Sequence, residues 1–374
     1  MVEASLRYAP QTPVPPGEVL AELLEERGMT QAELARRAGL SKDHVSRIIR
    51  AVAPVTFDTA LALERVLQLS ASFWVGMENT YRELKQRAVQ EDALSQTADI
   101  VRQFPYAELV KYGYVEAAAP VGKKAEQLLS FMGVASFEAL GLQYPVTASL
   151  RVAASKRPSP YALAAWLRMG ELAAATMATV AYDEQALRAV LPRLRELSRV
   201  ADASFQHLLR DRLAQCGVAL CLVPHLPRTY AHGATQWLRP DKAMIQLSLR
   251  GAYADVFWFT LCHEIGHLLL RHSKKKVYIT FEHPGEAPEE HEANCFAQNA
   301  LIPPEALADF RARPHRRSRQ AILHFAADIG VAPGIVVGRL QHDGDLPRSH
   351  LNALRPKLAW AAPAIEGAAN GCGR

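Results

Sequence analysis

Two histidines four residues apart lie in an apolar stretch of this chain, with a glutamate directly after the first. The string is His263-Glu264-Ile265-Gly266-His267. In an α-helix, residues i and i+4 lie on one face, one turn apart. Two imidazoles placed in this way can bind one divalent cation, and Glu264 can then reach a water molecule beside them. The spacing predicts His263 and His267 as metal ligands and Glu264 as the catalytic base of a metal-dependent hydrolase.

The motif fixes only three positions, so a second interpretation stays open: a buried helix whose histidines bind backbone carbonyls. Three observations favour the metal site. The flanking residues are apolar over a length that suits a core helix. Asp255 is expected to cap the N-terminus of that helix. A second helix with acidic residues follows at a suitable distance along the chain.

A catalytic metal site needs a third protein ligand and an open position for water. The candidates lie in segment 288–301, a predicted helix bounded by prolines at both ends. One face of this helix is small and apolar apart from Glu290 and Asn294. A carboxylate on such a face would be buried without a partner unless it met a cation. We therefore predict Glu290 as the third ligand, and Asn294 as a side chain that orients a ligand through a hydrogen bond.

Other acidic and histidine side chains near the motif remain alternatives. Glu292 lies on the opposite face of the predicted helix and is the second candidate for the third ligand, although Glu289 and Glu292 are both expected on the solvated surface. His272, His283 and His291 are expected to be surface or helix-end histidines. The predicted metal is Zn²⁺, while two histidines and a glutamate also accept Mn²⁺ or Fe²⁺.

The strings HEIGHLLLRH and EEHEANCFAQNALIPPE resemble the ImmA/IrrE family of metallopeptidases, over roughly residues 205 to 350. In that family, a glutamate three residues before an Ala-Asn or Ala-Asp pair completes a zinc site. The resemblance implies His263, His267 and Glu290 as zinc ligands and Glu264 as the base. It also implies a zincin-like endopeptidase with a protein substrate, since members of the family are known for cutting helix-turn-helix repressors.

The N-terminal part has the pattern of a helix-turn-helix unit. A helix begins after Thr30, Gly39 makes a turn, and Ser41 caps a further helix that extends to Arg50. In such a unit the second of these helices enters the major groove of DNA. The alternative is a helical bundle used only for dimerisation. The residues expected to be exposed on the second helix are Ser41, Lys42, Asp43, His44, Ser46 and Arg47.

The runs PPGEVLAELLEERGMTQAELARRAGLSKDHVSRIIR and PVTFDTALALERVLQLSASFWVGMENTY closely resemble the Cro/CI-type (XRE) repressor fold, and within it the HigA-type antitoxins of addiction modules. This resemblance covers roughly residues 12 to 88. It implies a homodimer that reads a palindromic operator in double-stranded DNA. It also implies that Gln31 contacts phosphate and that Lys42, Asp43, His44 and Arg47 approach bases or backbone.

Composition sets broad limits on the class of protein. Hydrophobic residues make up 49% of the 374 residues and charged residues 22%, which is ordinary for a soluble globular protein. A formal net charge of +5 permits contact with nucleic acid without requiring it. No uninterrupted apolar stretch is long enough to suggest a membrane span. The five cysteines form no C-x-x-C pair, which favours reduced thiols in the cytoplasm.

The predicted fold class is α+β and mostly helical, with an all-α N-terminal end. Runs 217–223 and 243–249 are apolar strand patterns, which predict a small antiparallel sheet beside the metal helix. The predicted organisation is a flexible lead (1–15), a Cro/CI-type helix-turn-helix domain (16–88), a helical middle region (89–204), a metallopeptidase domain with the sheet (205–350) and a C-terminal tail (351–374).

Taken together, the patterns predict a cytoplasmic DNA-binding transcriptional regulator, antitoxin-like, with no membrane association. Its zinc-dependent endopeptidase domain would hydrolyse a protein partner, either a repressor or a toxin. One alternative is a non-catalytic antitoxin or repressor that uses the metal domain as a structural or sensing module. Another is a repressor regulated by the metal. Glu264 favours catalysis, because a sensor has no need of a base.

Overall fold

The computed structural model describes residues 13–144, 158–200, 204–251, 253–281 and 287–359. The predicted lead and the predicted C-terminal tail therefore lie mostly outside the described residues. The chain divides into two compact units, one within Met1–Ala98 and Ala119–Glu126, the other within Asp99–Ala118 and Gln127–Arg374. The predicted fold class is confirmed: the structure is mostly helical, with one small sheet of four strands in the second unit.

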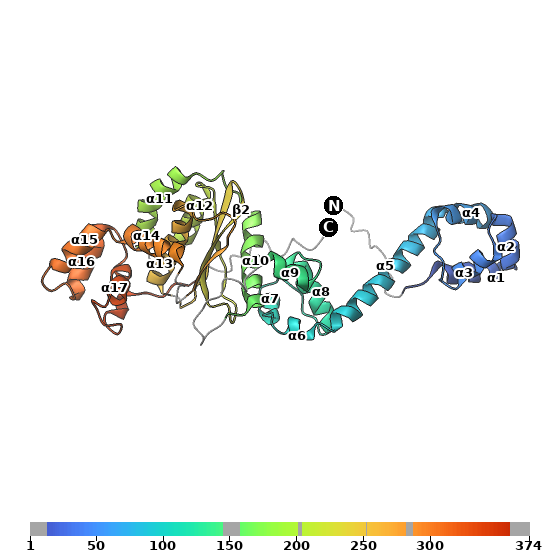
Figure 1. Ribbon diagram of the computed structural model, residues 1–374, viewed down its shortest axis with the longest axis horizontal. Coiled ribbons are helices and arrows are strands. Elements are labelled where there is room, and N and C mark those ends of the chain that lie inside the picture. The colour runs from blue at the N-terminus through green and yellow to red at the C-terminus, as the bar shows by residue number, and fades with distance from the viewer. Residues whose placement is uncertain (1–12, 145–157, 201–203, 252, 282–286, 360–374) are drawn as a thin grey trace. The chain divides into compact units, whose positions relative to one another are not determined.

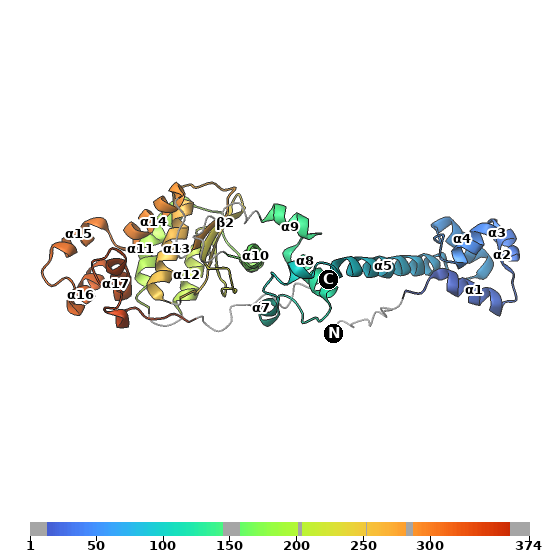
Figure 2. The same ribbon diagram turned by 60° about the horizontal axis from the view of Figure 1, so that its bottom comes forward.

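The first unit is a bundle of short helices gathered around the beginning of one long helix (Figure 2). Its core consists of large apolar side chains, among them Leu34, Leu63 and Trp74, each with no exposed surface. The helices are α1 (Pro16–Glu26), α2 (Gln31–Ala38), α3 (Lys42–Ile49), α4 (Phe57–Leu67) and α5 (Ala71–Ser95).

The turn between α2 and α3 forms from local interactions. Thr30 accepts a hydrogen bond from the backbone N–H of Glu33, and Ser41 Oγ accepts one from the N–H of His44 at 3.0 Å. Gly39 ends α2 with φ of 69°, a left-handed conformation that costs glycine little. These contacts confirm the predicted helix, turn and capped helix.

A buried carboxylate connects the segment after α3 to α5. Glu78, only 6% exposed, accepts a hydrogen bond from the backbone N–H of Val55 at 3.0 Å. Arg82 lies one turn further along α5 and donates to the same carboxylate. Because a buried carboxylate is costly without donors, this arrangement fixes the path of the chain between α3 and α4.

The remaining helices and strands follow along the chain. They are α6 (Ala98–Val101), α7 (Tyr106–Lys111), α8 (Val121–Met132), α9 (Phe137–Gln143), α10 (Pro160–Thr176), α11 (Glu184–Leu197), α12 (Phe205–Ala214), β1 (Val218–Leu222), β2 (Ala231–Arg239), β3 (Lys242–Leu247), α13 (Ala254–Leu269), β4 (Tyr278–Phe281), α14 (Pro288–Leu301), α15 (Pro304–Ala312), α16 (Arg319–Ile329), α17 (Pro333–His342) and a 3₁₀ turn, Asn352–Leu354.

The sheet is mixed, so the predicted antiparallel sheet is wrong in one strand pair. The strand order is β1-β3-β2-β4, and β1 runs parallel to β3 while the other two pairs are antiparallel. The segment between β1 and β2 carries the chain past the position of β3, which the β2–β3 hairpin then fills. Every residue of β1 and β3 is buried, as expected for strands covered on both faces.

Helices cover both faces of the sheet. Helix α10 lies on one face, and α12 and α13 lie on the other (Figure 1). The main core contains Leu261 and Ile265 of α13, Ile245 of β3 and Leu187 of α11. Helix α11 thus belongs to this core, although it lies in the region 89–204 that was predicted as a separate helical middle.

The expectation that Asp255 caps α13 is wrong. The helix begins after Tyr253, and Asp255 lies within its first turn. Its Oδ2 instead accepts a hydrogen bond from Arg355 Nε at 3.0 Å. This carboxylate therefore connects the first turn of α13 to the segment after α17. Asp255 does not cap the helix because its carboxylate pairs with the guanidinium of Arg355, which is distant along the chain.

Within the described residues, no single helix is long and apolar enough to cross a membrane. The pair α16 and α17, bent by 113° at its break, passes that test by length and composition alone. The inward residues of this pair, among them Phe325, Val336 and Val337, belong to the main core with α13.

Helix α10 is attached to β3 by buried polar side chains. Lys242 is 7% exposed, and its Nζ donates to the carbonyls of Ala174 and Met177 at 2.7 Å and 2.6 Å. Gln246, also on β3, donates to the carbonyl of Trp166 at 2.7 Å. A cation at a helix C-terminus satisfies carbonyls that have no intrahelical donor.

We expect Lys242→Met to lower the free energy of unfolding by about 1–3 kcal/mol, because the buried carbonyl of Ala174 and the half-buried carbonyl of Met177 both lose the hydrogen bond from the ammonium group. Urea denaturation of the full chain, followed by tryptophan fluorescence, measures this. The exposed Lys275→Met is the control and should change stability by less than about 0.5 kcal/mol. Equal stability of both variants would contradict the role of Lys242.

Candidate metal centre

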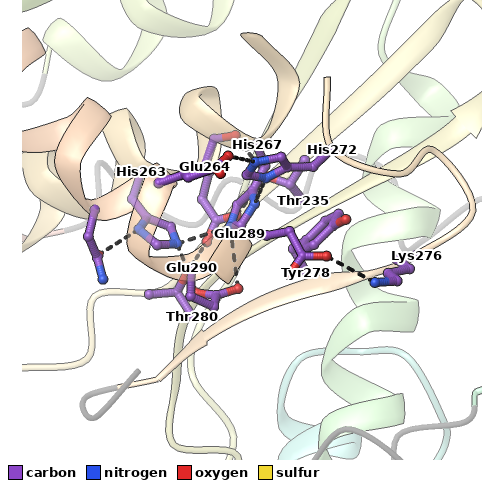
Figure 3. A network of polar contacts seen from close by, with 12 residues as sticks. Thr235, His263, Glu264, His267, His272, Lys276, Tyr278, Thr280, Glu289 and Glu290 are labelled. Atoms are coloured by element: carbon purple, nitrogen blue, oxygen red, sulfur yellow. Dashed lines mark hydrogen bonds and ion pairs between the residues drawn. The ribbon is translucent and has the colours of Figure 1, made fainter. Parts of the chain in front are cut away.

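The two predicted histidine ligands and the predicted glutamate lie together (Figure 3). His263 Nε2 and His267 Nε2 are 3.0 Å apart on α13. Glu290 comes from α14, with Oε2 at 3.2 Å from His263 Nε2 and Oε1 at 3.6 Å from His267 Nε2. One ligand atom from each residue lies within 4.8 Å of the other two. Two helices that are separate along the chain thus supply one cluster of metal-binding groups.

Small residues allow these two helices to approach closely. A Cβ atom on Gly266 of α13 would lie 3.3 Å from the Cα of Ala293 and 3.1 Å from the ring of Phe296. Ala293 and Ala297 of α14 have no exposed surface. Since Glu290 precedes Ala293 by one helical turn, the close contact brings its carboxylate onto the two imidazoles.

The arrangement fits a cation. His263 Nδ1 lies 2.9 Å from Asn294 Oδ1, and because an amide oxygen only accepts, Nδ1 carries the proton and Nε2 keeps its lone pair. This lone pair faces His267 Nε2 and the carboxylate of Glu290. Glu290 Oε2 is buried and has no hydrogen-bond donor among the described residues. A divalent cation would satisfy these converging acceptors, which otherwise repel each other.

The pKa values of the histidines follow from this environment. Burial lowers the pKa of His267 to about 2, helped by the nearby His263 and His272, so His267 stays neutral and able to bind metal. Burial also lowers the pKa of His263. In its protonated form His263 can donate from Nε2 to Glu290, and this bond together with the charges of Glu264 and Glu290 outweighs the effect of burial, so the pKa of His263 is raised overall. His263 is therefore the imidazole at which protons compete with a cation.

The predicted base is fully buried and held by the sheet. Thr235 Oγ1 of β2 donates to Glu264 Oε2 at 2.6 Å, and Thr280 Oγ1 of β4 donates to Glu264 Oε1 at 2.6 Å. Burial raises the pKa of Glu264 to about 7, although His263 and the two threonines lower it in part. A carboxylate with this pKa can accept and return a proton near neutral pH.

Gly233 of β2 leaves room for this carboxylate. A Cβ at that position would lie 2.5 Å from Glu264 Oε1 and 2.6 Å from Thr260 Cγ2. Sequence reasoning missed Gly233, Thr235 and Thr280. They lie on strands, and no spacing along the chain relates them to the helix that carries Glu264.

A further histidine contacts His267 on the ring nitrogen that faces away from the cluster. His272 Nδ1 lies 2.8 Å from His267 Nδ1, and the ring of Tyr278 stacks on His267 with centroids 4.3 Å apart. His272 follows the end of α13, where a helix-end histidine was expected, but its side chain is buried, with only 6% exposed. Its Nε2 lies 3.2 Å from Glu292 Oε2. The neighbouring residues thus hold one tautomer and one ring orientation of His267.

The alternative ligands lie elsewhere. The side chain of Glu292 is 60% exposed and contacts His272 rather than the histidine pair. Glu289 forms an ion pair with Lys276 at 3.1 Å. His291 is exposed on α14, at 3.6 Å from Cys295 Sγ. His283 lies outside the described residues.

The helix-turn-helix surface keeps most of the predicted DNA-contacting residues accessible. Gln31, Lys42, Asp43 and Arg47 are exposed, and Ser41 is exposed although its hydroxyl caps α3. Two other predicted residues are only half-exposed. The backbone carbonyl of Ser46 accepts from Arg50 Nε at 3.3 Å, and His44 Nε2 lies 3.3 Å from Thr59 Oγ1 of α4.

Two family models match separate parts of the chain. Residues 20–74 match a model described as helix-turn-helix. Residues 243–341 match the peptidase M78 model, described as an IrrE N-terminal-like domain. These matches confirm the two resemblances that the sequence motifs indicated, each over its own segment.

Solved structures with similarity to the chain include an antidote protein, an antitoxin with a promoter and a protein in complex with operator DNA. An addiction module antidote protein of the HigA family from Coxiella burnetii is 25% identical, with 22% of this chain and 92% of that chain covered and a TM-score of 0.21. The Pseudomonas aeruginosa antitoxin HigA with the higBA promoter is 31% identical, with 22% of this chain and 90% of that chain covered and a TM-score of 0.21. PA4674 of Pseudomonas aeruginosa in complex with its operator DNA is 33% identical, with 21% of this chain and 85% of that chain covered and a TM-score of 0.21. No curated protein sequence matches the chain.

We expect Zn²⁺ to raise the melting temperature of the protein, and His263→Ala and Glu290→Ala to abolish the rise. At a free Zn²⁺ concentration of about 100 times Kd, binding to the folded state adds about 2.7 kcal/mol. Differential scanning calorimetry with and without Zn²⁺ measures the effect. Glu305→Gln, which changes an exposed acidic residue of the next helix, α15, is the control and should keep the full shift.

The Zn²⁺ affinity should fall as pH decreases, because a protonated imidazole cannot bind a cation. The raised pKa of His263 places this loss at a higher pH than an ordinary histidine would. Isothermal titration over a pH series measures it. A Zn²⁺ affinity that does not change with pH would contradict the assignment of His263.

Proposed function

We propose that this chain, with a helix-turn-helix segment and an IrrE N-terminal-like segment, is a cytoplasmic transcriptional regulator of the antitoxin type that also acts as a zinc-dependent endopeptidase. It would bind an operator in double-stranded DNA and hydrolyse peptide bonds of a protein partner, either a repressor or a toxin. The observation that carries the catalytic part is the position of Glu264, a fully buried carboxylate that two threonines hold next to a cluster of metal-binding groups.

Three side chains would hold the cation: His263, His267 and Glu290, with Asn294 orienting His263. When bound, a zinc ion acidifies a water molecule and polarises a peptide carbonyl. His267 stays neutral because it is buried, and the contact with His272 holds the orientation of its ring. The protein therefore prepares two lone pairs and one carboxylate in advance, which lowers the cost of binding.

Glu264 would act as the general base. Its position directly after His263 puts it beside the proposed cation, and Thr235 and Thr280 fix both carboxylate oxygens. After taking a proton from water, the same carboxyl group would deliver it to the leaving amine. A site that only binds metal for structure has no use for a buried carboxylate in this position. This is why we favour catalysis over a structural or sensing role.

The first unit would bind DNA through α3. Lys42 and Arg47 are exposed on this helix and carry positive charge toward solvent. The other proposed contacts are Gln31 at the start of α2 and the α3 residues Ser41, Asp43, His44 and Ser46. His44 and Ser46 would contribute less, because both are only half-exposed. A palindromic operator would require two copies of the unit.

We expect Glu264→Gln to lower the rate of peptide-bond cleavage by about 100-fold or more, because it removes the base and leaves all three ligands in place. Purified protein with Zn²⁺ is mixed with repressors or toxins encoded beside its gene, and cleavage is followed by electrophoresis and mass spectrometry. Glu305→Gln, at an exposed glutamate of α15, is the matched control and should cut at the wild-type rate.

Cleavage by Glu264→Gln at the wild-type rate would reject Glu264 as the base. If no offered protein is cut and chelation of the metal changes operator affinity, the chain is instead a metal-regulated repressor. Zinc-dependent stabilisation of Glu264→Gln equal to wild type confirms that the variant still folds and binds metal.

We expect Arg47→Ala to weaken operator binding by about 1–3 kcal/mol if the guanidinium contacts a base, and to lower the salt dependence of binding if it contacts phosphate. Fluorescence anisotropy with DNA from the promoter of its own gene measures both. Arg102→Ala removes an exposed arginine from the other unit and is the control. Unchanged affinity and unchanged salt dependence for Arg47→Ala would exclude it from the interface.

A further inference from the structure

The backbone turn after α13 returns His272 to the end of the helix that carries His267. The N–H of His272 donates to the carbonyl of His267 at 3.1 Å. Arg271, just before it, has a φ of 59°, a left-handed conformation that is strained for a residue with a side chain. Arg271 Nε also donates to Glu184 Oε2 of α11 at 2.9 Å. The chain therefore holds His272 in one place beside the metal-binding cluster.

Three polar side chains form a row from the cluster to the protein surface. His267 Nδ1 lies 2.8 Å from His272 Nδ1, and His272 Nε2 lies 3.2 Å from Glu292 Oε2. Exposure of the side chain rises along the row, from 1% for His267 to 6% for His272 and 60% for Glu292. Because each atom of the row contacts the next, the position of a proton at one contact decides its position at the following one.

With both rings neutral, two arrangements of the protons fit these contacts. In the open arrangement, His267 donates from Nδ1 to His272 Nδ1, and His272 donates from Nε2 to Glu292. In the blocked arrangement, His272 donates from Nδ1 to His267, and His267 donates from Nε2 to His263 Nε2 at 3.0 Å. Only the open arrangement leaves the lone pair of His267 Nε2 free for a cation.

We propose that Glu292 is a positioning residue that favours the open arrangement by acting through His272. A carboxylate only accepts hydrogen bonds, and a bond to it is roughly twice as strong as one between neutral groups. The blocked arrangement would turn the lone pair of His272 Nε2 toward this negative charge. The open arrangement leaves two Nε2 lone pairs facing each other until a cation binds, so it needs such a stabilising partner.

Helix α14 then supplies partners for both imidazoles of the cluster. Glu290 lies against the imidazole pair, and Asn294 accepts from His263 Nδ1 at 2.9 Å. Glu292, two residues after Glu290, reaches His272 instead. The close approach of α14 to α13 therefore brings the third ligand and sets the proton positions of both histidines at once. This inference rests on the proposed metal site and not on peptide cleavage.

Two variants of Glu292 separate the hydrogen bond from the charge. Glu292→Ala and Glu292→Gln both remove the negative charge, but only glutamine keeps an acceptor oxygen. We expect Glu292→Ala to raise the Kd for Zn²⁺ about 10-fold, and Glu292→Gln to stay within about threefold of the wild-type Kd. Isothermal titration of the full chain with Zn²⁺ measures both. An equal loss of affinity in the two variants would show that only the charge matters and would overturn the proposal.

A double variant tests whether Glu292 acts through His272. His272→Phe keeps a ring beside Tyr278 and removes both nitrogens, and it should raise the Kd for Zn²⁺ about 10-fold or more. In that background, adding Glu292→Ala should change the Kd by less than about twofold. Two losses that multiply would contradict an action in series. Glu305→Ala, at an exposed glutamate of α15, is the control and should keep the wild-type Kd. Circular dichroism checks that each variant is folded.

Nuclear magnetic resonance of the metal-free chain, labelled with ¹⁵N in its histidines, reports the proton positions directly. The share of His267 with its proton on Nδ1 should fall in Glu292→Ala and be retained in Glu292→Gln. An unchanged share in Glu292→Ala would overturn the proposal even if zinc binding and cleavage are intact. The expected change in a protein that cuts nothing would support it and leave the proposed peptidase activity rejected.

Discussion

The candidate site depends on how closely α13 and α14 approach. Gly266 and Ala293 meet at the contact, where a Cβ atom on Gly266 would lie only 3.3 Å from the Cα of Ala293. Only at this short separation does the Glu290 carboxylate reach the two imidazoles. Metal-binding geometry is thus a consequence of small-residue packing between two helices that also share the apolar core.

The sheet provides the other half of the site. Strands β2 and β4 lie against α13 and supply Thr235 and Thr280, while Gly233 leaves space for the carboxylate between them. The same burial that orients Glu264 raises its pKa to about 7. Positioning and acid–base strength therefore have one physical origin, which is the exclusion of water from the contact between helix and sheet.

The first unit uses local interactions where the second uses packing. Side-chain caps and a left-handed glycine define α2, the turn and α3 within a few residues of one another. The buried Glu78, 23 residues from Val55, and the apolar core that contains Trp74 connect this motif to the long helix α5. The exposed polar residues of α3 are not part of this core.

The amino-acid sequence by itself determined whatever has a short period or a local partner. This includes the helix-turn-helix with its caps, the two histidines on one face of α13, and the small face of α14 that carries Glu290 and Asn294. Spacing could place these residues because a helix repeats every few positions.

Only the tertiary structure decided what depends on partners distant in the chain. It brought Thr235, Thr280 and His272 to the site and made the sheet mixed. It also paired Asp255 with Arg355, so that Asp255 does not cap α13. It also placed α11 in the core of the second unit. These contacts join residues that no local repeat relates. They are selected by the free energy of burying apolar surface and pairing buried polar groups across the whole unit.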